Sequence, residues 1–152
     1  MTQTYDLVVL GVGMAGLTAA NRCAREGWSV AVIDPLPYGG TCALRSCDPK
    51  KMLRRGAEIV DAARLMAGNG VHERDLRIDW SAPMAHKRTV TESLSGKIVR
   101  GLDGKGVTTL HGPARFTGED TLDVDGRTIT TGHVLIATGQ RPCDQDMMGR
   151  SW

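Results

Sequence analysis

The sequence is poor in aromatic side chains and nearly balanced in charge. Aromatic residues make up 4% of the 152 residues, and 19 Lys and Arg against 17 Asp and Glu leave a formal net charge of +2. Proteins that bind nucleic acids usually combine a basic face with aromatic rings on which bases stack. Because both features are missing, we expect no nucleic-acid partner.

The sequence also lacks long apolar runs and a high density of cysteine. No stretch approaches the roughly 18 to 20 apolar residues that span a bilayer, and the first apolar run follows an acidic residue rather than a basic leader. Four cysteines are too few for a secreted disulfide scaffold of this length. We therefore expect a cytoplasmic chain without a membrane partner, in which the neighbouring Cys42 and Cys47 suggest redox or metal chemistry.

The composition is that of a globular protein, and the first apolar segments predict a strand, a helix and a second strand. Hydrophobic residues make up 41% and charged residues 24% of the chain. Residues 5–10 and 29–33 are short apolar runs typical of buried parallel strands, and residues 14–27 carry small and apolar side chains at helical spacing. Parallel pairing of these strands requires a right-handed crossover, so the chain is expected to begin with a βαβ unit.

The rest of the chain predicts a helical middle followed by short strands. A helix with an irregular first turn is expected over 41–67, interrupted by Pro49, and a second helix over 83–99. A glycine-rich linker is expected at 101–106, and Asp125-Gly126 is a hairpin turn signal. The strands are expected at 107–110, 114–117, 122–124, 128–130 and 133–137. The predicted fold class is α/β, with a βαβ start, a helical middle and a small β-meander.

A glycine motif connects the first predicted strand and helix. Residues 11–16 read Gly-Val-Gly-Met-Ala-Gly, and Asp34 closes the second strand 18 residues later. In such a loop Gly11 permits a tight turn, Gly13 admits a pyrophosphate close to the backbone and Gly16 allows helix and strand to pack, while the acidic residue accepts bonds from a ribose. The motif predicts a dinucleotide site without distinguishing FAD from NAD, and a ligand-free glycine turn is the alternative.

Cys42 and Cys47 stand five residues apart in a basic segment. A regular helix would separate them by about 7.5 Å along its axis, beyond the roughly 7 Å between Cα atoms that a disulfide tolerates, so a disulfide requires a distorted turn. Residues 45–55 contain five basic residues and one acidic residue, which favours thiolate over thiol. Three interpretations of this pair remain open here: a reactive dithiol, two inert core cysteines and a metal-binding pair. Cys23 lies on an apolar helix face and is expected to be a core residue.

Three segments together resemble a known family. Residues 11–16, residues 39–51 (Gly-Gly-Thr-Cys-Ala-Leu-Arg-Ser-Cys-Asp-Pro-Lys-Lys) and residues 133–142 (His-Val-Leu-Ile-Ala-Thr-Gly-Gln-Arg-Pro) occur in the order found in the pyridine nucleotide-disulfide oxidoreductases. The chain resembles the N-terminal FAD-binding part of that family from about Tyr5 to Pro142. The resemblance implies a Rossmann-like FAD-binding domain over 1–142, followed by an unmatched tail at 143–152.

The resemblance also implies roles for individual residues. Cys42 would attack a small-molecule or protein disulfide, Cys47 would face the flavin, and Lys50 or Lys51 would place an ammonium near the flavin ring. In the complete family, hydride passes from NAD(P)H through FAD to the disulfide. The residues implied in FAD binding are Gly11, Gly13, Met14, Ala15, Gly16, Asp34, Gly40, Thr41, Ala114, Thr138 and Gly139.

The sequence departs from the family pattern in several places. Asp34 replaces the more usual Glu, and Ser46 replaces the more usual Gly before the second cysteine, which predicts a less comfortable turn. A second glycine motif for a nicotinamide cofactor is missing, as is the interface domain that supplies the family's acid/base pair and homodimer contacts. We therefore expect a truncated or frameshifted chain that does not turn over alone. The competing hypotheses are a nonenzymatic dinucleotide-binding module with structural cysteines and an ordinary NAD-dependent dehydrogenase.

Overall fold

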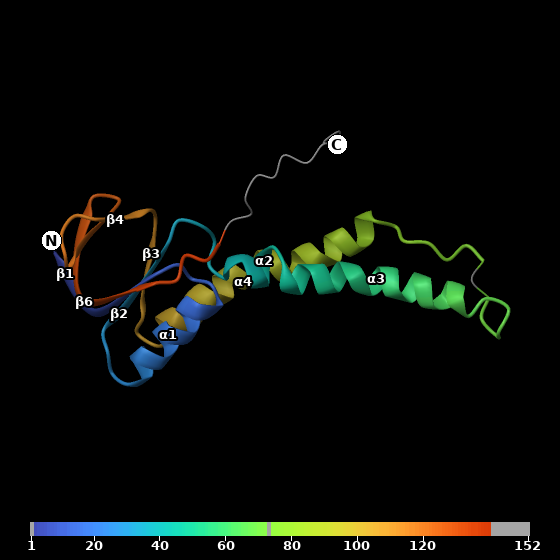
Figure 1. Ribbon diagram of the computed structural model, residues 1–152, viewed down its shortest axis with the longest axis horizontal. Coiled ribbons are helices and arrows are strands. Elements are labelled where there is room, and N and C mark those ends of the chain that lie inside the picture. The colour runs from blue at the N-terminus through green and yellow to red at the C-terminus, as the bar shows by residue number, and fades with distance from the viewer. Residues whose placement is uncertain (1, 73, 141–152) are drawn as a thin grey trace.

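The computed structural model describes residues 2–72 and 74–140 as one mixed six-stranded sheet with helices on one side and a helical arm (Figure 1). The helices are α1 (Met14–Arg25), α2 (Gly40–Leu44), α3 (Cys47–Leu65) and α4 (Ser81–Asp103). The strands are β1 (Gln3–Leu10), β2 (Val30–Asp34), β3 (Thr108–His111), β4 (Ala114–Phe116), β5 (Thr121–Val124) and β6 (Arg127–Ile136). The predicted α/β class, with its βαβ start, helical middle and β-meander, is confirmed.

The strand order is β3-β2-β1-β6-β5-β4, with the first four strands parallel and the last two antiparallel. β3 and β4 stand at opposite ends of this order, yet only Gly112 and Pro113 separate them in sequence. So short a connection requires the sheet to curl, which brings the antiparallel strands over one face of the parallel strands. The parallel strands are therefore covered on both faces, as their apolar sequences predict.

Two apolar clusters fill the two faces of the parallel strands. On the helix side, Leu7 and Val9 of β1 pack with Ala20 of α1 and Leu102 of α4. On the other side, alternate strand residues pack against the meander; this cluster contains Val8, Leu10, Ala31, Ile33, Leu110, Leu122, Val124 and Ile129. The alternation follows from the opposite directions of successive side chains in a strand. Packing on both faces thereby fixes the carboxyl ends of β1, β2 and β6 relative to one another.

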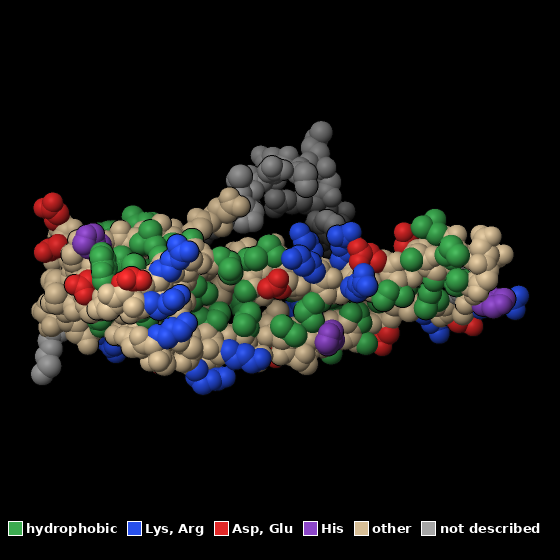
Figure 2. All heavy atoms as spheres, turned by 90° about the horizontal axis from the view of Figure 1, so that it is seen from below, with side chains coloured by type: hydrophobic (Ala, Val, Ile, Leu, Met, Phe, Trp, Pro, Cys, Tyr) green, Lys and Arg blue, Asp and Glu red, His purple; other side chains and the backbone are tan. Residues whose placement is uncertain are grey.

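The helices α3 and α4 form an arm that extends away from the sheet (Figure 1). The C-terminal end of α4 returns to the sheet, where Leu102 is buried. Figure 2 shows apolar and basic side chains distributed along this arm. None of the helices in the described part of the chain has the length and apolar character needed to cross a membrane.

Three boundaries differ from the sequence prediction. The expected linker at 101–106 is wrong at its start, because α4 continues to Asp103 so that Leu102 reaches the core. The expected strands at 128–130 and 133–137 are one strand, because β6 pairs with β1 along most of its length. The expected helix at 41–67 is two helices separated by Arg45 and Ser46. The tail at 143–152 lies outside the described residues, so its separation from the domain stays a prediction.

Candidate functional site

The glycine loop between β1 and α1 is fixed by backbone packing at its first residue. Gly11 has a φ of +98°, and its N–H donates to the Ile33 carbonyl oxygen at 2.8 Å. A Cβ on Gly11 would overlap the Ala137 carbonyl oxygen and lie 2.9 Å from the Thr138 Cα. Gly11 is therefore required by the fold itself. The same contact places the Thr138-Gly139 segment directly beside the glycine loop.

Gly13 and Gly16 differ in the space around them. A Cβ on Gly16 would overlap the Gly11 carbonyl oxygen, so the packing of helix on strand requires glycine there. A Cβ on Gly13 would meet only the Gly40 Cα, at 3.8 Å, and the φ of Gly13 is −89°. Neither packing nor backbone conformation demands a glycine at position 13. The space beside Gly13 is thus open, as the sequence prediction of a close pyrophosphate requires.

The N-terminus of α1 is open to an anionic ligand. Gly13 is the N-cap residue, no side chain caps the helix, and the first turn has no acidic residue. The N–H groups of a first turn have no partner within the helix and favour negative charge. Met14 is 60% exposed and Ala15 is also exposed. Of the predicted residues, Met14 and Ala15 are thus accessible, whereas Gly16 is buried.

Asp34 lies at the end of β2, and its carboxylate accepts hydrogen bonds from two backbone N–H groups. Its Oδ2 accepts a bond of 2.7 Å from the Val12 N–H, and its Oδ1 accepts one of 2.9 Å from the Leu36 N–H. The carboxylate has about four lone-pair sites, so acceptor capacity remains for a ribose hydroxyl. The Gly112 N–H donates to the Asp34 carbonyl oxygen at 3.3 Å, which brings the turn before Ala114 beside the predicted ribose position.

The loop after β2 brings the cysteine segment to the glycine loop. The Gly39 N–H donates to the Val12 carbonyl oxygen at 2.9 Å, and a Cβ on Gly40 would lie 2.7 Å from the Gly13 Cα. The Tyr38 hydroxyl donates to the Leu110 carbonyl oxygen at 2.6 Å and so ties this loop to β3. Gly40 begins α2, which places the exposed Thr41 directly after this close contact and Cys42 one residue further on.

The break between α2 and α3 gives the cysteine pair the distorted turn that the sequence predicts. Cys42 lies in α2, Cys47 begins α3, and Arg45 and Ser46 have φ values of −128° and −130°. The negative φ of Ser46 does not by itself require glycine, and the expectation of a less comfortable turn stays a prediction. Both cysteines are half-buried and present as free thiols.

The two thiols have opposite pKa shifts. A hydrogen bond between them, with Cys42 as the donor, lowers the pKa of Cys47, and Ser46 and the Lys50 charge lower it further against the effect of burial. The same hydrogen bond raises the pKa of Cys42, with burial and the Cys47 charge acting in the same direction. Cys47 is therefore the more easily ionised thiol of the two.

The two lysines after Pro49 act on different cysteines. The Lys50 charge lowers the pKa of Cys47, whereas the Lys51 charge lowers the pKa of Cys42 against larger opposing effects. Both lysines are exposed on the first turn of α3. Lys50 therefore favours ionisation of Cys47, and Lys51 favours ionisation of Cys42.

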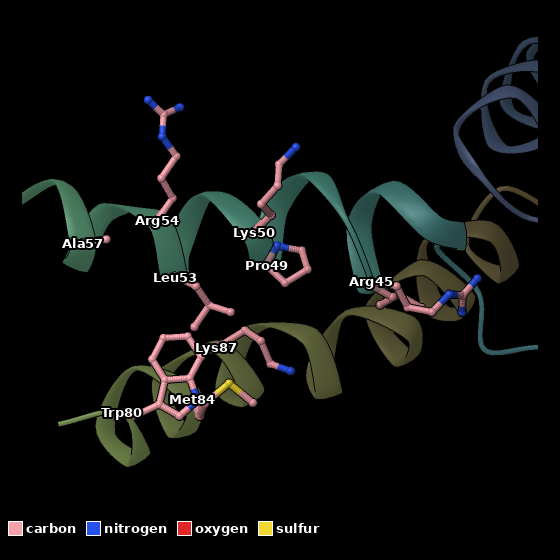
Figure 3. A pocket seen from close by; sticks show the side chains of 10 residues that line it. Arg45, Pro49, Lys50, Leu53, Arg54, Ala57, Trp80, Met84 and Lys87 are labelled. Atoms are coloured by element: carbon pink, nitrogen blue, oxygen red, sulfur yellow. The ribbon is translucent and has the colours of Figure 1, made fainter. Parts of the chain in front are cut away.

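A groove of about 640 Å³ lies between α3 and α4, next to the cysteine segment. Leu53 of α3, Trp80 just before α4 and Met84 of α4 point toward one another in it, while the charged ends of Lys50 and Arg54 point away from it (Figure 3). Neither this groove nor the hydrogen bond from Tyr38 to the Leu110 carbonyl oxygen is expected from the sequence. Helical spacing could have signalled the apolar faces, but not which faces meet.

The described residues thus gather all three sequence segments at the carboxyl ends of β1, β2 and β6. The Ala137 N–H donates to the Leu10 carbonyl oxygen at 2.7 Å, and Gly139 follows with a φ of +75°. Ala114 is half-buried beside the meander and lies at the edge of this assembly. Within residues 2–72 and 74–140, no three His, Cys, Asp or Glu side chains are grouped to hold a metal ion.

Comparison with known proteins identifies the family. The model of the pyridine nucleotide-disulphide oxidoreductase family matches residues 5–151. The chain is 33% identical over 138 residues to a glutathione reductase of Burkholderia cepacia, and 34% identical over 140 residues to a dihydrolipoyl dehydrogenase of Thermus scotoductus. These alignments cover 91% and 92% of the chain. The chain belongs to the pyridine nucleotide-disulphide oxidoreductases, as its three segments predict.

The chain corresponds to only part of these relatives. The alignments cover 31% of the Burkholderia cepacia protein and 30% of the Thermus scotoductus protein, so the chain spans about a third of their length. A dihydrolipoyl dehydrogenase of Mycoplasma pneumoniae, 30% identical over 139 residues, is covered to the same 30%. Members of the family are flavin-dependent oxidoreductases that bind FAD and use NAD(P)H, which agrees with the cofactors expected from the sequence.

Proposed function

We propose that this chain is the FAD-binding part of a disulfide reductase, with Cys42 and Cys47 as its redox-active pair. The observation that carries the proposal is the convergence of the three segments at one edge of the sheet. Gly11 lies against Ala137 and Thr138, and Gly13 lies against Gly40, two residues before Cys42. A nucleotide on the glycine loop would therefore extend toward the thiols.

The glycine loop and its surroundings fit the two ends of FAD. The uncapped first turn of α1 and the open space at Gly13 would hold the pyrophosphate, with Met14, Ala15 and Gly16 as the backbone donors. Asp34 would accept bonds from the ribose, and Ala114 would lie on the adenine side. Thr41 and the Thr138-Gly139 segment would flank the ring. When bound, FAD supplies the two-electron transfer from NAD(P)H that regenerates the dithiol.

The cysteines would reduce a disulfide substrate in two exchanges. The Cys42 sulfur, on giving up its proton, attacks one substrate sulfur, the substrate S–S bond breaks and one thiol leaves as a mixed disulfide forms. The Cys47 thiolate then attacks the Cys42 sulfur, which releases the second substrate thiol and joins the two cysteines. The substrate gains two electrons and two protons: the pair supplies both electrons and the Cys42 proton, and water supplies the second proton.

The setting of this activity belongs to the same proposal. We place the protein in the cytoplasm, acting on a small-molecule or protein disulfide, and we propose that turnover with NAD(P)H needs segments found in the longer relatives, including those through which a homodimer would form. NAD(P)H oxidation by the purified 152-residue chain in the presence of FAD would contradict the last point. Failure of this chain to oxidise NAD(P)H while it binds FAD would support it.

The test is a titration of the reduced chain with FAD, followed by thiol alkylation. We expect the visible flavin absorbance to remain with the protein after gel filtration, and we expect bound FAD to slow alkylation of Cys47 more than that of Cys23. Cys23 is a matched control because it is half-buried in α1 against the core, away from the cysteine pair. Retained FAD with no effect on either cysteine would favour a nonenzymatic dinucleotide-binding module. Binding of NAD but not FAD would favour an ordinary dehydrogenase.

A further inference from the structure

The groove between α3 and α4 begins at the cysteine segment. One of its lining residues, Arg45, lies between the two cysteines in sequence. Another, Pro49, follows Cys47 by two residues in α3, which is about 3 Å along the helix axis. The groove volume of about 640 Å³ lies in the range of about 300 to 1,000 Å³ that is typical of small-molecule sites. A small ligand in this groove would therefore have one end beside the thiols.

The end of the groove that lies farther from the cysteines is apolar. The lining residues form two facing rows, with Ala57 and Trp80 at one end and Arg45 at the other (Figure 3). Leu53 and Met84 are half-buried between these ends, and Trp80 is 59% exposed. An exposed indole ring beside two half-buried apolar side chains provides a surface on which the apolar part of a ligand can pack.

The end of the groove next to the cysteines is positively charged. Lys87 is half-buried and extends toward the exposed Arg45 and Lys50 (Figure 3), and none of the described lining residues is acidic. The ion pairs that the described residues form both join arginines of α3 to Glu58, one of them Arg54 of this groove. Lys87 therefore has no carboxylate partner within the described part of the chain. A half-buried ammonium without a counter-ion favours an anionic group beside it.

We propose that this groove is the substrate groove of the reductase and that it selects small disulfides with an apolar body and an anionic group. The inference rests on the proposed redox role of the cysteines and names the class of disulfide on which they act. The apolar body would lie against Trp80 and Met84, and the anion would face Lys87 and Arg45. Because the cationic end lies next to the cysteines, an anion bound there would hold the S–S bond of the substrate beside the pair.

Two aromatic disulfides are matched probes for this selection. Dithiobis(nitrobenzoate) carries a carboxylate on each ring, whereas dithiodipyridine is uncharged in mildly alkaline solution. With either probe, one cysteine sulfur bonds to a ring sulfur, the S–S bond of the probe breaks and the first ring thiolate leaves. The second cysteine then attacks the first, which releases the second ring thiolate and oxidises the pair to a disulfide. The probe gains the two electrons that the pair loses, and the thiol protons pass to the solvent.

Three substitutions separate the charged end of the groove from its apolar end. Lys87→Gln removes the half-buried charge, and Trp80→Ala removes the exposed ring. Lys97→Gln removes a charge from an exposed position of α4 that is not among the lining residues, so it is the matched control. None of the three side chains is among the groups that shift the ionisation of Cys42 or Cys47. A change in rate would then report binding in the groove.

The experiment mixes the reduced full chain with each probe, stops the reaction with acid and follows each cysteine by peptide mass spectrometry. Lys87→Gln should slow the reaction of the pair with the anionic probe by about 2- to 5-fold and leave the neutral probe unaffected. Trp80→Ala should slow both probes by about 3- to 10-fold, and Lys97→Gln should slow neither. Cys23, half-buried in α1, should react at the same rate in all variants, which shows that the fold stays closed.

Two results would overturn the groove and leave the redox pair standing, provided that a disulfide between Cys42 and Cys47 still forms. The first is an equal effect of Lys87→Gln and Lys97→Gln on the anionic probe, which would assign the selection to overall charge. The second is an unchanged rate for both probes in Trp80→Ala. Stable mixed disulfides between the probe and both cysteines, without a disulfide between Cys42 and Cys47, would instead contradict the proposed redox function.

Discussion

A methyl group added at Gly13 should weaken FAD binding while leaving the ligand-free protein folded. The Cβ of Gly13→Ala would meet only the Gly40 Cα, at 3.8 Å, and the φ of −89° suits alanine. Alanine is a poorer N-cap than glycine by about 0.5 to 1 kcal/mol, and lower entropy of the unfolded chain offsets about 0.4 to 1 kcal/mol. The free energy of unfolding should therefore change by less than about 1 kcal/mol.

The effect on binding should be much larger, because the added methyl occupies the space assigned to the pyrophosphate. Displacement that breaks one hydrogen bond to a charged phosphate oxygen costs about 1.5 to 3 kcal/mol. The dissociation constant for FAD should thus rise by about 10- to 150-fold. A larger rise would indicate that the whole diphosphate is expelled.

Two other glycines provide matched controls. In Gly16→Ala the Cβ would overlap the Gly11 carbonyl oxygen and lie 3.1 Å from Val9 Cγ1, so overpacking should cost about 1 to 3 kcal/mol, reduced by up to about 1 kcal/mol of helix propensity. In Gly56→Ala, within α3, the Cβ would make an ordinary contact with Ile78 Cδ1 at 3.9 Å, and stability should rise by up to about 1 kcal/mol. Gly56→Ala should bind FAD normally.

Denaturant unfolding of the ligand-free variants, followed by circular dichroism, gives the stabilities, and titration monitored by flavin absorbance gives the dissociation constants. Gly13→Ala should therefore lose FAD affinity while it keeps nearly the stability of the unchanged protein. Normal FAD affinity in Gly13→Ala would refute the assignment of this space to the pyrophosphate. An unfolded Gly13→Ala protein would refute the claim that only a ligand requires glycine there.

Three further substitutions test the supports of the site. Asp34→Ala should destabilise the ligand-free protein by about 1 to 3 kcal/mol, because it leaves the buried Val12 N–H without its acceptor, while water can replace the acceptor of the part-buried Leu36 N–H; denaturant unfolding would measure the loss. Burial, aided by the charges of nearby carboxylates, raises the pKa of Tyr38 to about 12, so its contribution to stability should be complete below pH 10 and be lost as the pH rises toward 12. Tyr38→Phe should abolish that alkaline loss and cost about 1 kcal/mol at neutral pH through the bond to Leu110; an unchanged alkaline profile would contradict this. Hydrogen bonds from Ser29 lower the pKa of Asp6, so their contribution is present above about pH 4 and is lost in more acidic solution. Asp6→Asn should flatten the acid side of the stability profile, and a profile identical to that of the unchanged protein would show that the bonds contribute nothing.

The strands and the glycine loop could be predicted from the sequence because local signals and tertiary packing agree there. Apolar runs at residues 5–10 and 29–33 match β1 and β2 closely, and Asp125-Gly126 forms the turn that its sequence indicates, with positive φ at both residues. Gly11 was expected to permit a tight turn, which agrees with its φ of +98°, and Gly16 was expected to allow the helix to pack on the strand, which agrees with the lack of space for a Cβ there. Their role depends on short-range geometry, which a motif can encode.

The remaining features depend on contacts between distant residues. The Gly101–Gly106 segment contains helix because Leu102 reaches the core, a tertiary effect that outweighs the low helix propensity of glycine. Asp34, the last residue of β2, was expected to bind a ribose, but its hydrogen bonds to the Val12 and Leu36 N–H groups could not be foreseen from the motif. The unequal ionisation of Cys42 and Cys47 likewise required knowledge of which sulfur receives the donors. The functional roles of these residues remain predictions.

The pairing of β1 with β6 has a consequence for how the chain acquires its structure. β1 is synthesised before β6, yet it lies between β2 and β6, and its register with β6 joins Gln3 to Ile129 and Leu10 to Ile136. Closing a loop of this length is entropically unfavourable and is associated with slow folding. During synthesis, one edge of β1 therefore stays unpaired until β6 emerges from the ribosome. Among the strands that the structure describes, β1 waits longest for its second neighbour.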